Sequence, residues 1–103
     1  MIRNINSWNT LKKELHIGEI ISGKVFKIEP HGIYIDINKK FYGIVLAPYI
    51  SKNRITVENY PKIGEIVTGL IIHFSEEIDQ KNIEFNYVVV SMKDYISKSE
   101  SSI

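Results

Sequence analysis

Residues 32–37 (GIYIDI) constrain the fold more than any other stretch of the chain. Three isoleucines alternate strictly with Tyr34 and Asp36. A period of two places the isoleucines on one face of a β-strand and the tyrosine and aspartate on the other. The segment therefore predicts a half-buried strand that presents an aromatic ring on its outward face.

Turn signals bound this strand on both sides. Before it, Pro30 fixes its own φ and removes a hydrogen-bond donor, and Gly32 tolerates a dihedral that a Cβ atom would forbid. After it, residues 38–40 (NKK) form a short polar segment between two apolar runs, as in a hairpin. Residues 23–45 are therefore predicted to form a meander of three short strands.

A local repeat predicts where two further strands begin. The sequence IGEIISG at residues 17–23 returns as IGEIVTG at residues 63–69. Each copy places a glycine turn and one acid before an alternating run, which predicts strands at 19–28 and 65–74. The glycine inside each strand suits a sharp bend or a bulge, as the corners of a small closed barrel require.

The remaining segments complete an all-β domain. A fifth strand is predicted at residues 85–92, and residues 47–62, with two prolines, are predicted to connect the third strand to the fourth. Residues 76–82 (EEIDQKN) read as a polar hairpin tip. We expect an N-terminal extension with a short helix at 1–16, a barrel domain at 17–94 and a flexible tail at 95–103.

The N-terminal extension carries a short helical pattern. Trp8, Leu11 and Leu15 recur at helical spacing, and Ser7 is a candidate N-cap. A helix of this length is marginal in isolation and must pack against the domain. Trp8 is therefore expected to anchor the helix rather than to bind a ligand.

Composition narrows the class of protein. The chain of 103 residues has no cysteine, no apolar run near the ~20 residues that span a bilayer, and no signal-peptide pattern at its start. We expect a cytoplasmic protein with no membrane partner. Abundant isoleucine, lysine and asparagine with a single alanine is typical of an AT-rich, bacterial genome.

Charge is distributed unevenly although the net charge is only +1. Residues 1–62 carry ten bases against five acids, and residues 63–103 carry three bases against seven acids. Such asymmetry can give a near-neutral protein one basic face. Ordinary surface charge that segregates along the sequence explains the same pattern equally well.

The order of these motifs resembles the S1 RNA-binding domain family. The resemblance is carried by IGEIISGKVFKIEPHGIYIDI, FYGIVL, IGEIVTGLII and VVVSMKD, and it covers roughly residues 17–94. It implies a five-stranded OB-fold barrel that binds single-stranded RNA across its second and third strands by stacking and backbone contacts. Leu46 and Tyr87 stand where many members have histidine and arginine.

The resemblance also implies which residues would bind RNA. Tyr34 occupies the outward aromatic position of the second strand, and His31 replaces an aromatic residue before Gly32. Phe26 either joins Tyr34 on the outer surface or packs in the core, and Tyr42 is a weaker stacking candidate. The phosphate partners would be Lys24, Lys27, Lys39, Lys40 and Arg54. The alternative for these bases is ordinary solvation of turns and protection of strand edges.

The sequence gives little support for catalysis or for a cofactor. The histidines at positions 16, 31 and 73 lack metal-ligand spacing with carboxylates, and no Gly-rich phosphate loop is present. We therefore expect a non-enzymatic module that binds single-stranded RNA weakly and with little sequence preference. It would act alone or within a larger RNA-processing or translation assembly.

A protein-interaction module that keeps the barrel but has lost RNA binding is the alternative function. The near-neutral charge, Leu46, and the acidic residues Glu76, Glu77 and Asp79 favour it. In that case the amphipathic segment from Trp8 to Leu15 would be a docking element.

Overall fold

The structure, a computed structural model, describes residues 5–76 and 86–95. It contains one helix, α1 (Ile5–Glu14). The strands are β1 (Ile20–Glu29), β2 (Gly32–Asp36), β3 (Gly43–Leu46), β4 (Ile66–Ser75) and β5 (Tyr87–Ser91). Two 3-10 turns, η1 (Ala47–Tyr49) and η2 (Val57–Asn59), lie between β3 and β4.

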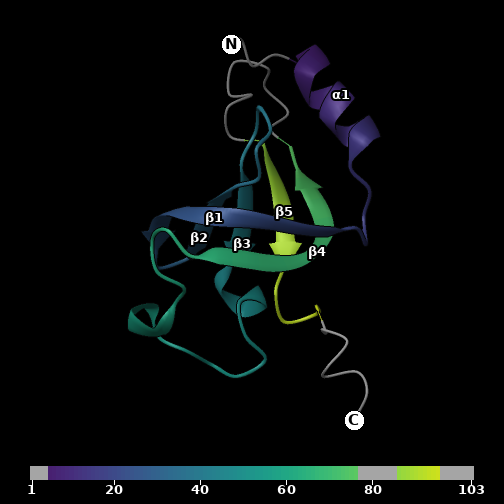
Figure 1. Cartoon of the computed structure of the whole chain (residues 1–103). Coiled ribbons are helices and arrows are strands. Elements are labelled where there is room, and N and C mark those ends of the chain that lie inside the picture. The colour runs from purple at the N-terminus through teal and green to yellow at the C-terminus, as the bar shows by residue number, and fades with distance from the viewer. Residues whose placement is uncertain (1–4, 77–85, 96–103) are drawn as a thin grey trace.

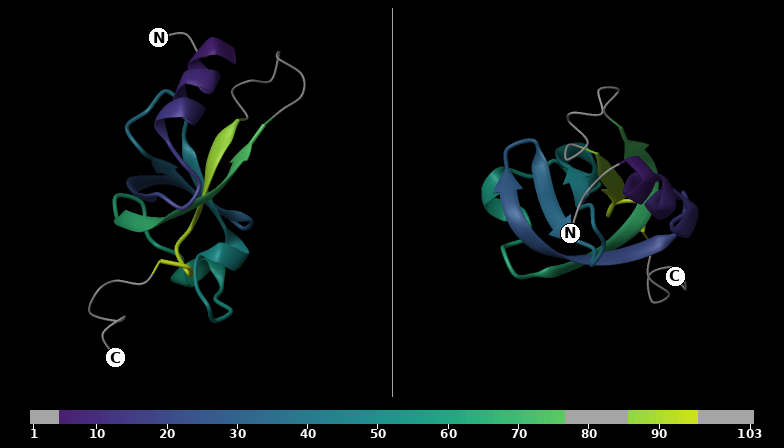
Figure 2. Two further views of the ribbon diagram at one scale, coloured as in Figure 1. Left: turned by 90° about the vertical axis from the view of Figure 1, so that its right-hand side faces the viewer. Right: turned by 90° about the horizontal axis from the view of Figure 1, so that it is seen from above.

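The five strands close into a barrel in the order β1-β2-β3-β5-β4 (Figure 1). The meander from β1 to β3 is antiparallel, β4 pairs with both β1 and β5 in antiparallel fashion, and β3 pairs with β5 in parallel. Figure 2 shows α1 across one end of the barrel. The prediction of a five-stranded barrel with a short N-terminal helix is confirmed.

The barrel closes because its two longest strands each belong to two parts of the sheet. Strand β1 pairs with β4 up to Lys24 and with β2 from there onward, and β4 changes partner in the same way at Leu70. A Cβ atom on Gly23 would lie 2.9 Å from a carbonyl oxygen of β2, and one on Gly69 would lie 2.6 Å from a carbonyl oxygen of β5. These glycines therefore allow close strand approach at the corners.

Gly23 and Gly69 were expected at a sharp bend or a bulge, and they lie at the corners of the barrel, whereas the bulges lie further along the strands. The register shifts between Val25 and Lys27 in β1 and between Ile71 and His73 in β4. The sequence could not decide between the two, because a glycine that permits close backbone approach and a glycine that forms a bulge leave the same signal.

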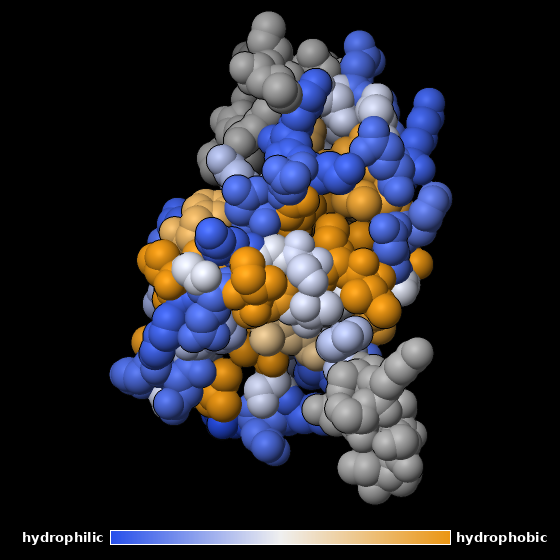
Figure 3. Space-filling view, in the orientation of Figure 1, coloured by the Kyte–Doolittle hydropathy of each residue, from blue (hydrophilic) through white to orange (hydrophobic). Residues whose placement is uncertain are grey.

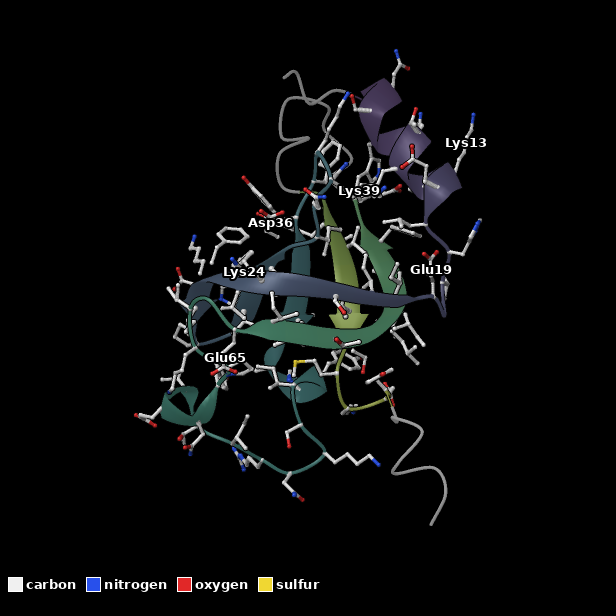
Figure 4. All side chains as sticks on the ribbon, viewed as in Figure 1. Lys13, Glu19, Lys24, Asp36, Lys39 and Glu65 are labelled. Carbon is white, nitrogen blue, oxygen red and sulfur yellow. The ribbon has the colours of Figure 1, made fainter. Side chains whose placement is uncertain are left out.

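The sequence repeat forms two equivalent turns at the beginning of β1 and β4. Gly18 and Gly64 have φ values of +90° and +94°, which favour glycine. The carboxylates of Glu19 and Glu65 each accept a hydrogen bond from the backbone N–H three residues earlier, at 3.0 and 3.1 Å. Figure 4 shows the two glutamates at opposite ends of the β1–β4 pair.

Helix α1 packs its apolar face onto the barrel. Trp8 is fully buried, its ring centroid lies 4.9 Å from that of Phe41 and 6.0 Å from that of Phe74, and its Nε1 donates a 2.8 Å hydrogen bond to Glu76. Lys12 also pairs with Glu76. The predicted anchoring role of Trp8 is confirmed. The apolar face is buried against the barrel, so it is not exposed as the docking element that the alternative function suggested.

Some local predictions differ from the structure or lie outside it. Ser7 does not cap α1, because the helix already begins at Ile5. The long connection forms two 3-10 turns, and Tyr60 holds it to the β1–β2 turn by donating a 2.9 Å hydrogen bond to the carbonyl of Pro30. Most of the predicted hairpin tip, and the tail beyond Tyr95, lie outside the described residues. Within the described residues, no helix has the length and hydrophobicity to cross a membrane.

Candidate nucleic-acid interface

Five ring side chains gather on the outer surface of the barrel, and we call this surface the aromatic face. Its members are Phe26, His31, Tyr34, Tyr42 and Tyr87. Centroids of neighbouring rings lie between 4.6 and 6.3 Å apart, and Tyr34 contacts three of the other four. The rings come from β1, the β1–β2 turn, β2, the residue before β3, and β5. The fold thus collects residues that are up to 61 positions apart in the sequence.

The bulge in β1 places two successive side chains on this surface. Val25 pairs with Ile35 and Lys27 pairs with Tyr34, so Phe26 is the extra residue. Phe26 is 39% exposed and its ring lies 4.6 Å from that of Tyr42. The Lys27 ammonium stands 5.1 Å from the centroid of the Tyr34 ring and 3.5 Å from Glu29. The Phe26 ring and the Lys27 ammonium therefore lie on the same face of the sheet. In a regular strand, two consecutive side chains would point to opposite faces.

Tyr34 is the centre of the aromatic face. It is half-buried, and its hydroxyl is hydrogen-bonded to His31 Nε2 at 2.8 Å. Burial among its neighbours, and secondarily the negative charge of Glu29, raise the pKa of the Tyr34 phenol. The ring therefore stays neutral at physiological pH, which keeps it suitable for stacking against a base.

The turn that carries His31 is fixed by the backbone. The carbonyl of His31 accepts a 2.8 Å hydrogen bond from the N–H of Ala47, and the carbonyl of Pro30 accepts the hydrogen bond from Tyr60. His31 is thereby held beside Tyr34 although it lies in a turn. Its side chain remains exposed.

Tyr87 joins the aromatic face through the parallel pairing of β3 with β5. Its ring centroid lies 5.5 Å from that of Tyr34, and the next residue, Val88, donates a hydrogen bond of 3.0 Å to the carbonyl of Tyr42. Sequence reasoning treated Tyr87 only as a departure from the family pattern. Alternation around Val88 and Val90 already pointed its side chain outward, and this signal could have identified it.

The bases predicted as phosphate partners lie in three places. Lys24 and Lys27 are on β1 beside the aromatic face, and Lys24 stands opposite Asp36 in the sheet register. Lys39 and Lys40 are in the β2–β3 turn, where Lys39 pairs with Glu14 of α1 at 3.3 Å (Figure 4). Arg54 lies apart from both groups, in the β3–β4 connection. Figure 1 shows this connection at the opposite end of the barrel from α1.

The arrangement combines the groups that a single-stranded nucleic acid can bind. Exposed and half-buried rings next to ammonium groups form a surface on which bases can stack while the cations meet phosphates. Among residues 5–76 and 86–95, no three histidine, aspartate or glutamate side chains come together as the ligands of a metal ion would.

Comparison with known proteins gives a family match over most of the chain. The sequence pattern of the S1 RNA binding domain matches residues 14–93. A polyribonucleotide nucleotidyltransferase of Listeria monocytogenes is 32% identical over 89 residues, which are 85% of this chain and 11% of that protein. The corresponding protein of Thermotoga neapolitana is 24% identical over 66 residues, 64% of this chain and 9% of that protein. The chain therefore spans about a tenth of the length of these relatives.

Solved structures support the same fold. The solution structure of GSP13 from Bacillus subtilis superimposes with a TM-score of 0.62 at 14% identity, over 84% of this chain and 64% of that one. A chain in the a/eIF2alpha–aDim2p–rRNA complex of Pyrococcus horikoshii gives a TM-score of 0.62 at 13% identity, over 84% of this chain and 49% of that one. At these identities the likeness establishes the architecture.

Proposed function

The chain belongs to the S1 RNA-binding domain family, and from this premise we propose that it binds single-stranded RNA on the aromatic face. The proposal rests on the cluster of five rings, which has Tyr34 at its centre, and on the Lys27 ammonium over the Tyr34 ring. Bases would stack on Phe26, Tyr34 and neighbouring rings, and Lys24 and Lys27 would contact phosphates. Stacking tolerates any base, so little sequence preference is expected.

The charge around the aromatic face implies weak binding that depends modestly on salt. Two lysines stand beside the rings, but Glu29 pairs with one of them and Asp36 lies opposite the other. Each phosphate neutralised on a single strand contributes about 0.7 to the slope of log affinity against log salt. Two contacts therefore predict a slope of about −1.4 for RNA that occupies the aromatic face alone, shallow for a nucleic-acid-binding protein.

Fluorescence anisotropy of a labelled single-stranded RNA of about a dozen nucleotides tests the proposal, since OB-folds occupy about 4–16 nucleotides. Saturable binding at low salt that weakens as salt rises, with weaker binding to the same sequence as a duplex, is the expected result. A duplex hides the base faces that stacking requires. Absence of binding at low salt by a folded sample would contradict the proposal.

Beyond the binding itself, we propose that the domain acts in the cytoplasm, within an RNA-processing or translation assembly. Three observations support this proposal. The chain belongs to the S1 family, a relative is a polyribonucleotide nucleotidyltransferase, and a protein of similar fold is part of a complex that contains rRNA. The domain itself would contribute binding and not catalysis.

Protein binding is the second candidate function, and one observation favours it. Four exposed isoleucines lie on β1, β4 and the turns before them, with 58 to 65% of their surface accessible: Ile17, Ile20, Ile63 and Ile66. Figure 3 shows hydrophobic side chains on this face of the molecule. The antiparallel pairing places Ile17 and Ile20 at one end of the β1–β4 pair and Ile63 and Ile66 at the other, so a protein partner that covers both ends would bury all four. A partner that survives nuclease treatment and is lost from an Ile20→Ser, Ile66→Ser double variant would support this function.

A further inference from the structure

A groove runs between helix α1 and the turn that joins β2 to β3. Its volume is about 870 Å³. One wall is the side of α1 that carries Asn6, Thr10 and Glu14. The other wall is formed by the last residue of β2 and three residues of the turn: Asp36, Asn38, Lys39 and Lys40. The groove is open to solvent, and Tyr42 lies at its edge. It is therefore a site that an extended chain could enter.

The groove continues from the aromatic face. Tyr42 belongs to both surfaces, because its ring lies 4.6 Å from that of Phe26 and it also lines the groove. A strand whose bases stack on Phe26 and Tyr34 and which continues past Tyr42 would next meet the groove. The two surfaces thus form one path over the molecule.

The walls carry the groups that nucleotides require. Asn6, Thr10 and Asn38 offer amide and hydroxyl groups that both donate and accept hydrogen bonds, which suits base edges and the ribose 2′-hydroxyl. The backbone of Asn38 is fixed by a 2.8 Å hydrogen bond from its N–H to Asp36, and Asn38 has a φ of 62°. Lys40 is exposed in the same wall.

An ion pair spans the groove. Lys39 Nζ lies 3.3 Å from a carboxylate oxygen of Glu14, and both side chains are substantially exposed, at 38% and 51%. Exposed pairs of this kind are weak. A phosphate group can therefore take the place of Glu14 beside Lys39, and Glu14 competes with RNA for that lysine.

We propose that this groove holds the nucleotides of a single-stranded RNA that extend beyond Tyr42, with Lys39 and Lys40 contacting phosphates and Glu14 restraining the affinity. The proposal rests on the proposed function of the aromatic face and extends it by a second subsite. Short RNA fills the aromatic face alone, and longer RNA fills both surfaces. The contribution of the groove must therefore depend on RNA length.

A substitution that fills the groove tests this length dependence. Thr10 is exposed on α1 and lines the groove, whereas Asn9 is also exposed and does not line it. Thr10→Trp should weaken binding of an oligouridylate of about a dozen nucleotides by about fivefold, the equivalent of a hydrogen bond or phosphate contact. Binding of an oligouridylate of about four nucleotides should stay the same. Asn9→Trp is the matched control and should change neither affinity.

A second variant tests the ion pair without adding bulk. Glu14→Gln frees Lys39 and should tighten binding of the longer RNA about two- to fivefold at low salt. The salt slope should stay close to that of the wild type, because Lys39 contacts the same phosphate in both complexes. Glu58→Gln removes the same charge on η2, away from the groove, and should leave affinity and slope unchanged.

The outcomes separate this proposal from the function on which it rests. If Thr10→Trp and Glu14→Gln both bind the longer RNA like the wild type while Tyr34→Ala binds it more weakly, the groove is not a subsite and the aromatic face remains one. If the wild-type protein binds neither RNA, both proposals are wrong. Circular dichroism of each variant establishes that it is folded.

Discussion

Replacement of Tyr34 by alanine is the most direct test of the aromatic face. The Tyr34 ring contacts Phe26, His31 and Tyr87 and lies beneath Lys27, so one base at most can stack on it. Loss of one stacked base costs about 1–3 kcal/mol. At 1.4 kcal/mol per factor of ten, we expect Tyr34→Ala to weaken RNA binding about tenfold, within bounds of about 5 and 150.

The same substitution also removes contacts that stabilise the fold. Ring pairs contribute about 0.5–1.5 kcal/mol each, and Tyr34 is only half-buried. A loss of about 1–2 kcal/mol in the free energy of unfolding is therefore expected. Affinity must accordingly be measured where circular dichroism shows the variant to be folded.

Tyr34→Phe is the matched control, because it keeps the ring and removes only the hydrogen bond to His31. Anisotropy titrations with the same labelled RNA should place Tyr34→Phe within about twofold of the wild type, since the base stacks on the ring. A folded Tyr34→Ala protein with wild-type affinity would refute the stacking role. So would a Tyr34→Phe protein as weak as Tyr34→Ala, because the hydroxyl would then be the binding group.

Three further substitutions test the stability of the fold. Trp8→Ala should lower the free energy of unfolding by about 3–5 kcal/mol in urea denaturation, because the ring is fully buried; a loss below about 1 kcal/mol would contradict its anchoring role. Gly32→Ala should lower the free energy of unfolding by about 1–3 kcal/mol, because the new Cβ would lie 2.4 Å from the carbonyl oxygen of Val45. A variant as stable as the wild type would show that β2 and β3 can move apart at this point. Glu76→Ala should cost about 1 kcal/mol at neutral pH, after allowance for solvent screening. Hydrogen bonds from Lys12 and Trp8 lower the pKa of Glu76. The stability that Glu76 contributes is therefore complete above the ordinary carboxyl pKa and is lost as the pH falls through the lower pKa of the folded protein. If Glu76→Ala lowered stability equally at acidic and neutral pH, the ionised carboxylate would not be the source.

The strands could be predicted because their signals are local. The predicted spans 19–28 and 65–74 differ by one residue from β1 and β4, since alternation and the repeated glycine turn are properties of a few neighbouring residues. The order of the motifs then identified the family and hence the barrel. Trp8 was correctly placed in the core because a short helix needs tertiary contacts to be stable.

The site was less accessible to sequence reasoning because it depends on distant pairings. Phe26 and Lys27 share a face only through the β1 bulge, and no residue marks its position. Tyr87 reaches Tyr34 only through the parallel register of β3 with β5, across residues separated by more than 40 positions. Arg54 was grouped with the other bases by charge alone, but it lies in the β3–β4 connection. This connection is at the end of the barrel opposite α1.

Helix α1 serves two structural purposes, and this decides how the RNA path can be tested. Its apolar face buries Trp8 and Leu11 against the barrel, and its polar face, with Thr10 and Glu14, forms one wall of the groove. Removal of the helix would expose core side chains and destabilise the barrel that carries the aromatic face. Weaker RNA binding by such a truncated chain would follow whether or not the groove binds nucleotides. Substitutions at Thr10 and Glu14 leave the buried face intact, so a change in binding that appears only with longer RNA can be assigned to the groove itself.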